Sequence, residues 1–495
     1  MTTQPAEVRV RDREPGMSGI YRGRRTPRGG LVNWVEPAAE WRGTTNQVCG
    51  LFPFSVGGET PVVGVPWGRN LLTGETICCD PISWFRPARI IANPSMILFG
   101  LPGLGKSTAA RRMVLGLAAG GVVPIIAGDL KPDYVELIRA LGGTVVTFAR
   151  GRGRLNPLDP GTLAAVARQL SGQARDQVLE EAHSRRVNMI LGLVQLQRSP
   201  APVAESELVV LDAAVRLLIE RSSPHDPPPQ LRDLWQLLED APEPLRAAAL
   251  DRGDDAQYRA VTRPLQVSLT GLMTGYGGMF AGQTSDAVTL DTPGMVVDVS
   301  GLGVHDLSMT AAVLLATWNE VYGTVWATNA LADAGLAPQR RTLIVLDELW
   351  RVLSAAPGMV DRINHLGRLN RNEGAGQLMI THSVKDFTLG SEADTAKAQG
   401  FVERAGMIAI GGVPRKELEL LGAEVLGLSG KEIDEVSRWS TPQTLTGNER
   451  PPGQGHFLIK VGSLPGIPVK VELTAAEITA NIHDTDRRWN SEATS

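Results

Sequence analysis

Apolar residues along the chain gather in short continuous runs, and most of these runs are followed by a segment with helical spacing. The runs at 96–99, 122–127 and 343–346 contain almost only apolar side chains, which is typical of strands covered on both faces. A further run at 295–299 has the same character. Because helix-forming segments separate these runs, the pattern predicts an α/β fold with a mainly parallel sheet.

The alternation of strands and helices is interrupted in the middle of the chain. There, Leu208, Leu211, Val215 and Leu218 recur at the spacing of one helix face, and further helical signals follow them. The pattern predicts a helical insertion over residues 161–290. We expect this insertion to act as a lid or a subunit contact and not as a second catalytic centre.

Weaker patterns complete the predicted organisation of the chain. Its start is rich in Arg, Gly and Pro without any period, which indicates a disordered basic arm. Such an arm is either a solvated tail or a contact for anionic lipid, DNA or a protein partner. Short apolar runs between turn residues follow and predict a small β-rich cap. The predicted segments are the arm (1–43), the cap (44–92), the first part of the α/β core (93–160), the helical insertion (161–290), the second part of the core (291–489) and a tail (490–495).

Composition restricts the class of protein only loosely. The 495-residue chain is 43% hydrophobic and 21% charged with a net charge of -4, so contacts with nucleic acid would have to come from local patches. Its cysteines, Cys49, Cys78 and Cys79, have neither disulfide-framework nor zinc-site spacing, which favours a reducing cytoplasm. No apolar run approaches the ~20 residues that a membrane-spanning helix needs. We therefore expect a cytoplasmic protein without an intrinsic membrane span, peripheral to the inner face of the membrane if it acts there.

The strongest chemical motif directly follows the run at 96–99 and opens a helix-forming segment. Its residues are Gly100, Leu101, Pro102, Gly103, Leu104, Gly105, Lys106, Ser107 and Thr108. This is the glycine-rich P-loop pattern, in the strand–loop–helix context that it requires. The glycines allow successive backbone N–H groups to converge on phosphate, and the helix N-terminus adds positive potential. We expect the loop to bind ATP, with Lys106 on the β- and γ-phosphates and Ser107 on Mg²⁺.

A second motif completes the predicted nucleotide site. The apolar run at 343–346 ends in Asp347 and Glu348, the pattern of a Walker B strand. We expect Asp347 to accept from the Mg²⁺ shell and Glu348 to act as the general base that polarises the attacking water. A glutamate in this position indicates hydrolytic, motor-like P-loop proteins and not small-molecule kinases.

Four other polar residues are candidates for catalysis. Asp129 follows the apolar run at 122–127, at the strand end where α/β proteins bind ligands, and it either orients water or Mg²⁺ or caps the next helix. His382 lies at the end of a later strand, where polar residues sense the γ-phosphate. Arg368 and Arg371 precede that strand, and either could reach a neighbouring subunit's nucleotide as an arginine finger or belong to an exposed basic helix face.

Taken together, these motifs resemble the conjugal-transfer ATPases of type IV secretion, within the superfamily of hexameric DNA-translocase-like motors. The resemblance covers about residues 90–489. It rests on the segments 100–108, 128–129, 155–159, 280–300, 347–350, 368–383 and 486–489. Two features depart from the family pattern. The N-terminal domain is short, and His382 stands where glutamine is common.

The resemblance implies a P-loop NTPase with a RecA-like central sheet and an inserted all-α lid. It implies a ring of identical subunits, a hexamer in that superfamily, which hydrolyses ATP with Mg²⁺ and energises conjugative DNA transfer or secretion through membrane channel components. Two alternatives stay open. One is a DNA translocase or coupling-type pump, which would contact DNA directly. The other is an ATP-dependent ring scaffold with little hydrolysis, although Glu348 argues against it.

Overall fold

A computed structural model of the chain describes residues 61–223, 226–286, 288–302, 306–356, 359–361, 374–421, 426–440, 453–480 and 482–483. In the arm it describes only a short pairing of β1 (Arg24–Arg25) with β2 (Leu31–Val32). Otherwise the predicted arm, the tail, and the candidate residues Arg368 and Arg371 lie outside the described residues.

Eleven of the described strands form one sheet that runs through the molecule. Their order across the sheet is β4-β3-β13-β12-β11-β5-β10-β9-β6-β8-β7. The strands are β3 (Pro66–Asn70), β4 (Thr76–Cys78), β5 (Ser95–Phe99), β6 (Val123–Asp129), β7 (Thr144–Thr147), β8 (Met295–Asp298), β9 (Thr342–Leu346), β10 (Ala375–Ile380), β11 (Met407–Ile410), β12 (His456–Lys460) and β13 (Ile467–Val471).

The sheet is parallel from β11 to β7 and antiparallel from β11 to β4. The parallel part contains the four apolar runs that the sequence marks as buried strands. On the antiparallel side β3 pairs with β13, so the strands expected to form an N-terminal cap extend the edge of the central sheet. The first and last described parts of the chain therefore meet in one layer.

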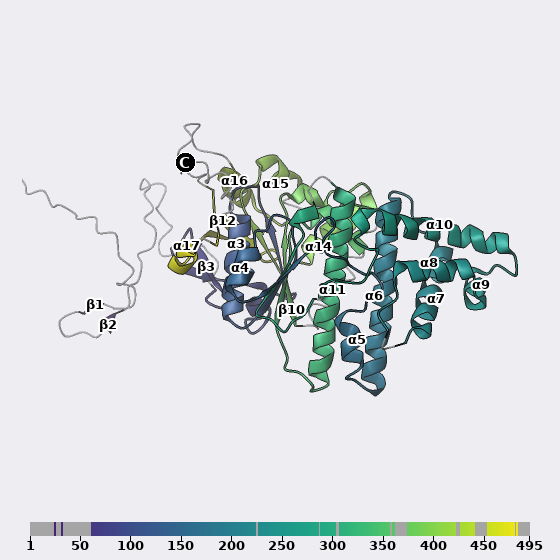
Figure 1. Ribbon diagram of the computed structural model, residues 1–495. Helices are drawn as coiled ribbons and strands as arrows, with labels where there is room; N and C mark the ends of the chain where they lie inside the picture. Colours follow the sequence, from purple (N-terminus) through teal and green to yellow (C-terminus); the bar gives the residue numbers. More distant parts are fainter. Residues whose placement is uncertain are drawn as a thin grey trace, which may run out of the picture.

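Helices cover both faces of the parallel strands (Figure 1). Along β5, Met96 and Leu98 belong to the apolar cluster of α3 (Lys106–Ala119) and α4 (Val135–Ala140). Ile97 and Phe99 point the other way, into the cluster that contains α6 (Gly172–Arg198) and α11 (Leu307–Asp333). Burial on both faces explains why β5 has no alternation of apolar and polar residues.

The segment predicted as a helical insertion contains helices up to residue 274. They are α5 (Thr162–Ala167), α6, α7 (Glu205–Arg221), α8 (Leu231–Asp240), α9 (Glu243–Ala249) and α10 (Asp255–Thr274). In Figure 1, α7 to α10 project beyond α6, on the side away from the sheet. Among the described residues of 275–290, a short 3₁₀ turn, Tyr276–Gly278, is the only helical element.

The remaining helices are short. They are α2 (Pro81–Phe85), α12 (Trp350–Leu353), α14 (Glu392–Glu403), α15 (Arg415–Leu421), α16 (Gly430–Trp439) and α17 (Ala475–Thr479), with 3₁₀ turns at Ser300–Leu302 and Val384–Phe387. None of the described helices combines the length and apolar character needed to cross a membrane.

Candidate nucleotide site

The predicted P-loop connects β5, at the centre of the sheet, to α3. Gly100, Gly103 and Gly105 have φ angles of 152°, 80° and 93°, a region that side chains with a Cβ rarely occupy. Gly105 is the residue before the first helical turn, and Lys106 begins α3. The glycine spacing therefore sets a tight strand-to-helix turn that leaves the N-terminus of α3 facing the carboxyl edge of the sheet, as phosphate binding requires.

Neighbouring loops brace the P-loop on one side. Leu101 donates its backbone N–H to the carbonyl of Gly412 (3.0 Å), just beyond β11. Gly455 donates to the carbonyl of Leu104 (3.0 Å), just before β12. A Cβ added to Gly105 would lie 3.3 Å from the nitrogen of Gly455, so the close approach also favours glycine. The loop is thus held in its shape by protein contacts.

Lys106 is buried and lies across the loop. Its Nζ donates to the carbonyl of Gly100. Burial lowers the pKa of Lys106 to about 8, and the carboxylates of Asp347 and Glu348 partly offset this effect. The protein offsets the desolvation of the Lys106 ammonium only in part, so a phosphate bound over the loop would stabilise its charged form. Ser107 and Thr108, both half-buried, follow in the first turn of α3.

Asp347 and Glu348 reach the same edge although their strand does not adjoin β5. In the sheet, β10 lies between β5 and β9, with Ile380 paired to Leu98 and Met379 paired to Leu346. Because these strands are parallel and in register, their carboxyl ends meet at one edge. The P-loop and the Walker B carboxylates therefore lie at the same edge of the sheet, at the ends of strands separated by β10.

Glu348 is buried and held by side chains from three strand ends. Its Oε1 lies 3.1 Å from the Nζ of Lys131 and 3.1 Å from the Nε2 of His382, and its Oε2 accepts from the indole N–H of Trp350 at 2.6 Å. Burial alone would raise the pKa of Glu348. The contacts with His382, Lys131 and Trp350 outweigh it and hold the pKa well below its ordinary value. Glu348 also has φ +54°, an unusual backbone conformation for a residue with a side chain.

Asp347 is half-buried, and its negative charge has fewer stabilising contacts than that of Glu348. Burial raises the pKa of Asp347 to about 7, and the nearby carboxylates of Glu348 and Asp129 add to the shift. A divalent cation would relieve both effects. In the described part of the chain no three His, Cys, Asp or Glu side chains group to hold a metal by themselves. Mg²⁺ usually takes one or two carboxylates plus substrate phosphates, which fits Asp347 with Ser107.

Asp129 is buried at the end of β6, where its carboxylate is already occupied. Its Oδ1 accepts from the backbone N–H groups of Lys131 (3.3 Å) and Asp133 (3.0 Å), and its Oδ2 from that of Tyr134 (2.7 Å). Burial raises the pKa of Asp129 to about 6, and these hydrogen bonds limit the rise. Of the two interpretations that the sequence left open, this arrangement supports a structural role in the turn that leads to α4.

His382 lies one residue beyond Thr381, at the end of β10, with its Nε2 directed at Glu348. Asp386 holds this tip, because its Oδ2 accepts from the backbone N–H groups of His382 (3.1 Å) and Ser383 (3.0 Å) and from the Thr381 hydroxyl. The imidazole therefore contacts the predicted base directly, as well as lying at the edge where a γ-phosphate would bind.

Two residues of the site received no role from the sequence. Lys131 lies two positions beyond Asp129, at the carboxyl end of β6, and Trp350 lies two positions beyond Glu348. The sequence feature that could have pointed to these two residues is their position just after a carboxylate at the end of a predicted strand. Nothing in the spacing indicated that both side chains would turn toward Glu348.

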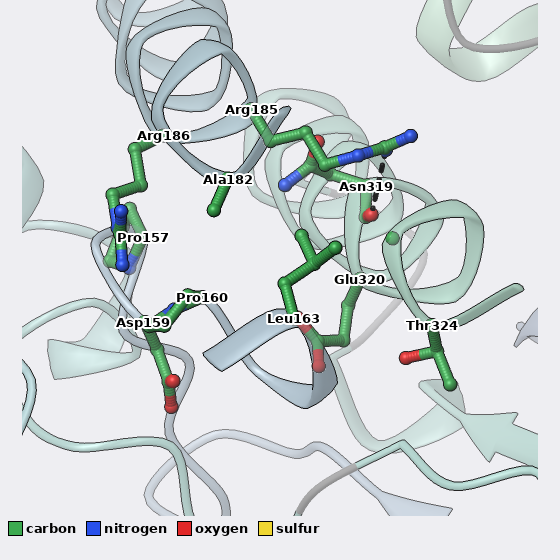
Figure 2. A pocket seen from close by; sticks show the side chains of 11 residues that line it. Pro157, Asp159, Pro160, Leu163, Ala182, Arg185, Arg186, Asn319, Glu320 and Thr324 are labelled. Atoms are coloured by element: carbon green, nitrogen blue, oxygen red, sulfur yellow. Dashed lines mark hydrogen bonds between the residues drawn. The ribbon is translucent and has the colours of Figure 1, made fainter. Parts of the chain in front are cut away.

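A cavity of about 10 Å³, room for roughly one water molecule, lies apart from this site. Its lining comes from α5, α6, α11 and the segment that precedes α5, and consists of Pro157, Asp159, Pro160, Leu163, Ala182, Arg185, Arg186, Asn319, Glu320, Gly323 and Thr324 (Figure 2). Burial raises the pKa of Glu320 to about 7, with a further contribution from Asp159. The cavity is far too small for a nucleotide.

Comparison with known proteins identifies the fold. No family model and no curated protein matches the chain. The solved structure of VirB4 from Thermoanaerobacter pseudethanolicus is similar to it, with a TM-score of 0.62 and 20% sequence identity, over 85% of this chain and 100% of that chain. The bacterial conjugative coupling protein TrwB, solved as TrwBΔN70, is similar with a TM-score of 0.50 and 13% identity, over 82% of this chain and 88% of that one. The predicted α/β fold class is thus confirmed.

Proposed function

We propose that this protein is an ATP-hydrolysing motor that energises conjugative DNA transfer or type IV secretion at the cytoplasmic face of a membrane. The observation that carries the proposal is the placement of Lys106 and Glu348 at one edge of the sheet, the first on the P-loop after β5 and the second beyond the Walker B strand β9, which is two strands away. A pure nucleotide-binding scaffold has no need for a buried, ionised glutamate at this position. The similarity of the fold to VirB4 over the whole of the solved VirB4 chain supports the choice of process.

The residues of the site have separate roles in the proposed hydrolysis of ATP. The backbone N–H groups of residues 100–108 (all except Pro102) and the ammonium of Lys106 would bind the phosphates of ATP, while Ser107 and Asp347 would hold Mg²⁺, which would supply charge neutralisation. Glu348 accepts a proton from the attacking water. His382 and Lys131 keep Glu348 ionised, and both are placed to respond to the charge of a γ-phosphate.

The site of one chain is incomplete for fast turnover. In the described part of the chain, Lys131 and Arg351 lie 3.1 and 3.9 Å from the carboxylate of Glu348, and residues 100–108 contain no arginine that could stabilise the transition state. We therefore propose a homo-oligomeric ring, a hexamer, in which Arg368 or Arg371 of a neighbouring subunit acts as an arginine finger. The ring would act with membrane channel components of the secretion or conjugation apparatus.

Steady-state ATP hydrolysis tests this function. We expect specific activity to rise with protein concentration as rings form and to be abolished in Lys106→Ala. Wild-type activity that is independent of protein concentration would contradict shared sites. An active Lys106→Ala variant would contradict the assignment of the P-loop.

A DNA pump of the coupling-protein type is the second candidate, since the fold is also similar to TrwB. Adding single- and double-stranded DNA to the same assay separates the two functions. Strong, salt-sensitive stimulation indicates a pump, because phosphate contacts release counterions. Activity that ignores DNA indicates a secretion motor, and nucleotide binding without hydrolysis indicates a scaffold.

A further inference from the structure

The loop after β7 is a tight turn that carries three arginines. Ala149 and Arg152 exchange both backbone hydrogen bonds, at 2.8 and 2.9 Å, and so form a short antiparallel bridge. Arg150, Arg152 and Arg154 alternate with Gly151 and Gly153, and all three arginines are exposed. We call residues 149–154 the arginine hairpin.

Glycine is required inside the arginine hairpin. Gly151 and Gly153 have φ angles of 73° and 81°. A Cβ at Gly153 would lie 2.6 Å from Cδ1 of Phe148, whereas a Cβ at Gly151 would meet nothing within 4 Å. The turn therefore depends on its glycines, and its tip at Gly151 leaves the backbone open to a close approach by another molecule.

The base of the arginine hairpin is tied to the core. Phe148, which is buried, donates its N–H to the carbonyl of Asp298 at the end of β8 (2.9 Å). The backbone N–H of Arg154 donates to the hydroxyl of Ser285 (3.2 Å), and the backbone N–H of Ser285 donates to the carbonyl of Arg154 (3.1 Å). Leu155 donates to the carbonyl of Met279 (2.9 Å). The arginines are thus presented from a fixed turn, which lowers the entropy lost on binding.

The charge of the arginine hairpin is only partly balanced. Arg150 lies 3.5 Å from the exposed carboxylate of Asp306. In the described part of the chain Arg152 and Arg154 form no ion pair, although the chain as a whole has a net charge of -4. Three neighbouring guanidinium groups repel one another, and among the described residues only the Arg150–Asp306 contact offsets that repulsion. The arrangement is understandable if an anionic partner supplies the missing charge.

We propose that the arginine hairpin binds the sugar–phosphate backbone of a nucleic acid strand. The planar guanidinium group of arginine donates two parallel hydrogen bonds to the oxygens of one phosphate. A nucleic acid backbone carries one charge per phosphate at regular intervals, and the glycines between the arginines let that backbone approach the loop closely. A lipid surface fits less well, because the hairpin has no apolar side chain larger than alanine to enter a bilayer. Contacts with the sugar–phosphate backbone do not involve the base edges, so binding should not depend on the nucleotide sequence.

The location of the arginine hairpin connects it to the nucleotide site. The hairpin begins at the carboxyl end of β7, on the same edge of the sheet as the P-loop. The end of β8 joins the two regions, because Val299 donates its N–H to the carbonyl of Asp129 (3.0 Å) while Asp298 accepts from Phe148. A strand held by the hairpin would therefore lie on the edge where ATP binds.

Fluorescence anisotropy with labelled 30-mer single strands and duplexes of unrelated sequences tests the proposal on the full chain. The test variant is Arg150→Ala/Arg152→Ala/Arg154→Ala. The matched control is Arg168→Ala/Arg175→Ala/Arg232→Ala, which removes the same charge from exposed arginines of the helical region. The N-terminal arm is present in all three proteins, so its contribution cancels.

We expect the hairpin variant to bind duplex about 10²-fold more weakly near 0.1 M salt and to lose about 2–3 from the slope of log K against log salt, as the loss of three phosphate contacts requires. The control variant should bind like wild type. Equal affinities and slopes for the two variants, or no binding by wild type, would overturn the proposal. So would a hairpin variant that keeps DNA affinity but loses self-association, which would make the hairpin a contact between copies. Binding by Lys106→Ala protein should be unchanged, so the outcome is separate from that of the hydrolysis assay.

Discussion

The Nζ of Lys131 lies 3.1 Å from the Oε1 of Glu348, and the same oxygen is contacted by the imidazole of His382. The two carboxylate oxygens of Glu348 therefore already have donors in the protein. A general base must accept a proton from water, and the ion pair with Lys131 lowers the proton affinity of Glu348, so loosening this contact would make Glu348 a better base. Lys131 is the candidate to move, because its side chain is 55% exposed and bears a full charge that a γ-phosphate attracts.

Substituting Lys131 tests this restraint. We expect Lys131→Met to raise kcat by about two- to fivefold, the factor that corresponds to the loss of an exposed ion pair of about 0.5–1 kcal/mol, with little change in KM. Lys131→Arg keeps the cation and should resemble wild type. A fall in kcat in Lys131→Met would instead show that Lys131 stabilises the transition state.

Glu348→Gln separates ATP binding from hydrolysis. The amide preserves the shape of the side chain but cannot accept the proton of the attacking water, so we expect kcat to fall by about 10²–10⁴ while ATP still binds. Nucleotide affinity is measured with a fluorescent ATP analogue, and Lys106→Ala, which should bind poorly, provides the contrast. Unchanged turnover would remove Glu348 from the mechanism.

Mixing experiments test whether an arginine acts between subunits. Arg368→Ala and Arg371→Ala are each combined with Lys106→Ala protein, and hydrolysis is followed against the mixing ratio. If one arginine acts on the neighbour's nucleotide, mixed rings contain some sites with an intact P-loop and an intact finger, so activity should partly recover. The absence of recovery with either variant would count against a finger at these positions.

Asp129 is predicted to stabilise the fold and not to bind the nucleotide. Asp129→Ala leaves buried N–H groups without an acceptor, and we expect it to lower the free energy of unfolding by about 1–3 kcal/mol. Asp129→Asn keeps one acceptor oxygen and should cost less. ATP affinity should change little in either variant that remains folded. A normal melting temperature with lost ATP binding would favour the role on Mg²⁺.

The pH dependence of stability reports on Glu320. Its pKa is about 7 in the folded chain, against an ordinary value of 4.5. The neutral carboxyl group thus favours the folded state, fully below pH 4.5, and this contribution is lost as pH rises through 7. The free energy of unfolding of Glu320→Gln lacks this pH-dependent loss. Between pH 5 and pH 8 the stability of the variant relative to wild type should therefore rise by about 1–3 kcal/mol.

Thermal melts at intervals across that range measure the effect. Glu205→Gln, at an exposed position on α7, is the matched control and should track wild type. A Glu320→Gln variant whose difference from wild type is the same at pH 5 and pH 8 would contradict the elevated pKa.

Local motifs were readable from the sequence because each lies within one contiguous segment. The P-loop needs only glycines at 100, 103 and 105 between a strand and a helix, and the Walker B motif needs only an apolar run before Asp347. Strands buried on both faces leave a continuous apolar signal, so the α/β class followed from the pattern.

Contacts between segments could be decided only by the tertiary structure. Hydrophobic periodicity states which residues are buried and is silent on strand order, so the insertion of β10 between β5 and β9 could not be foreseen, nor could the pairing of β3 with β13. The environment of Glu348 is set by Lys131, His382 and Trp350, which come from three strand ends. Their convergence depends on sheet register, a long-range property that spacing along the chain does not encode.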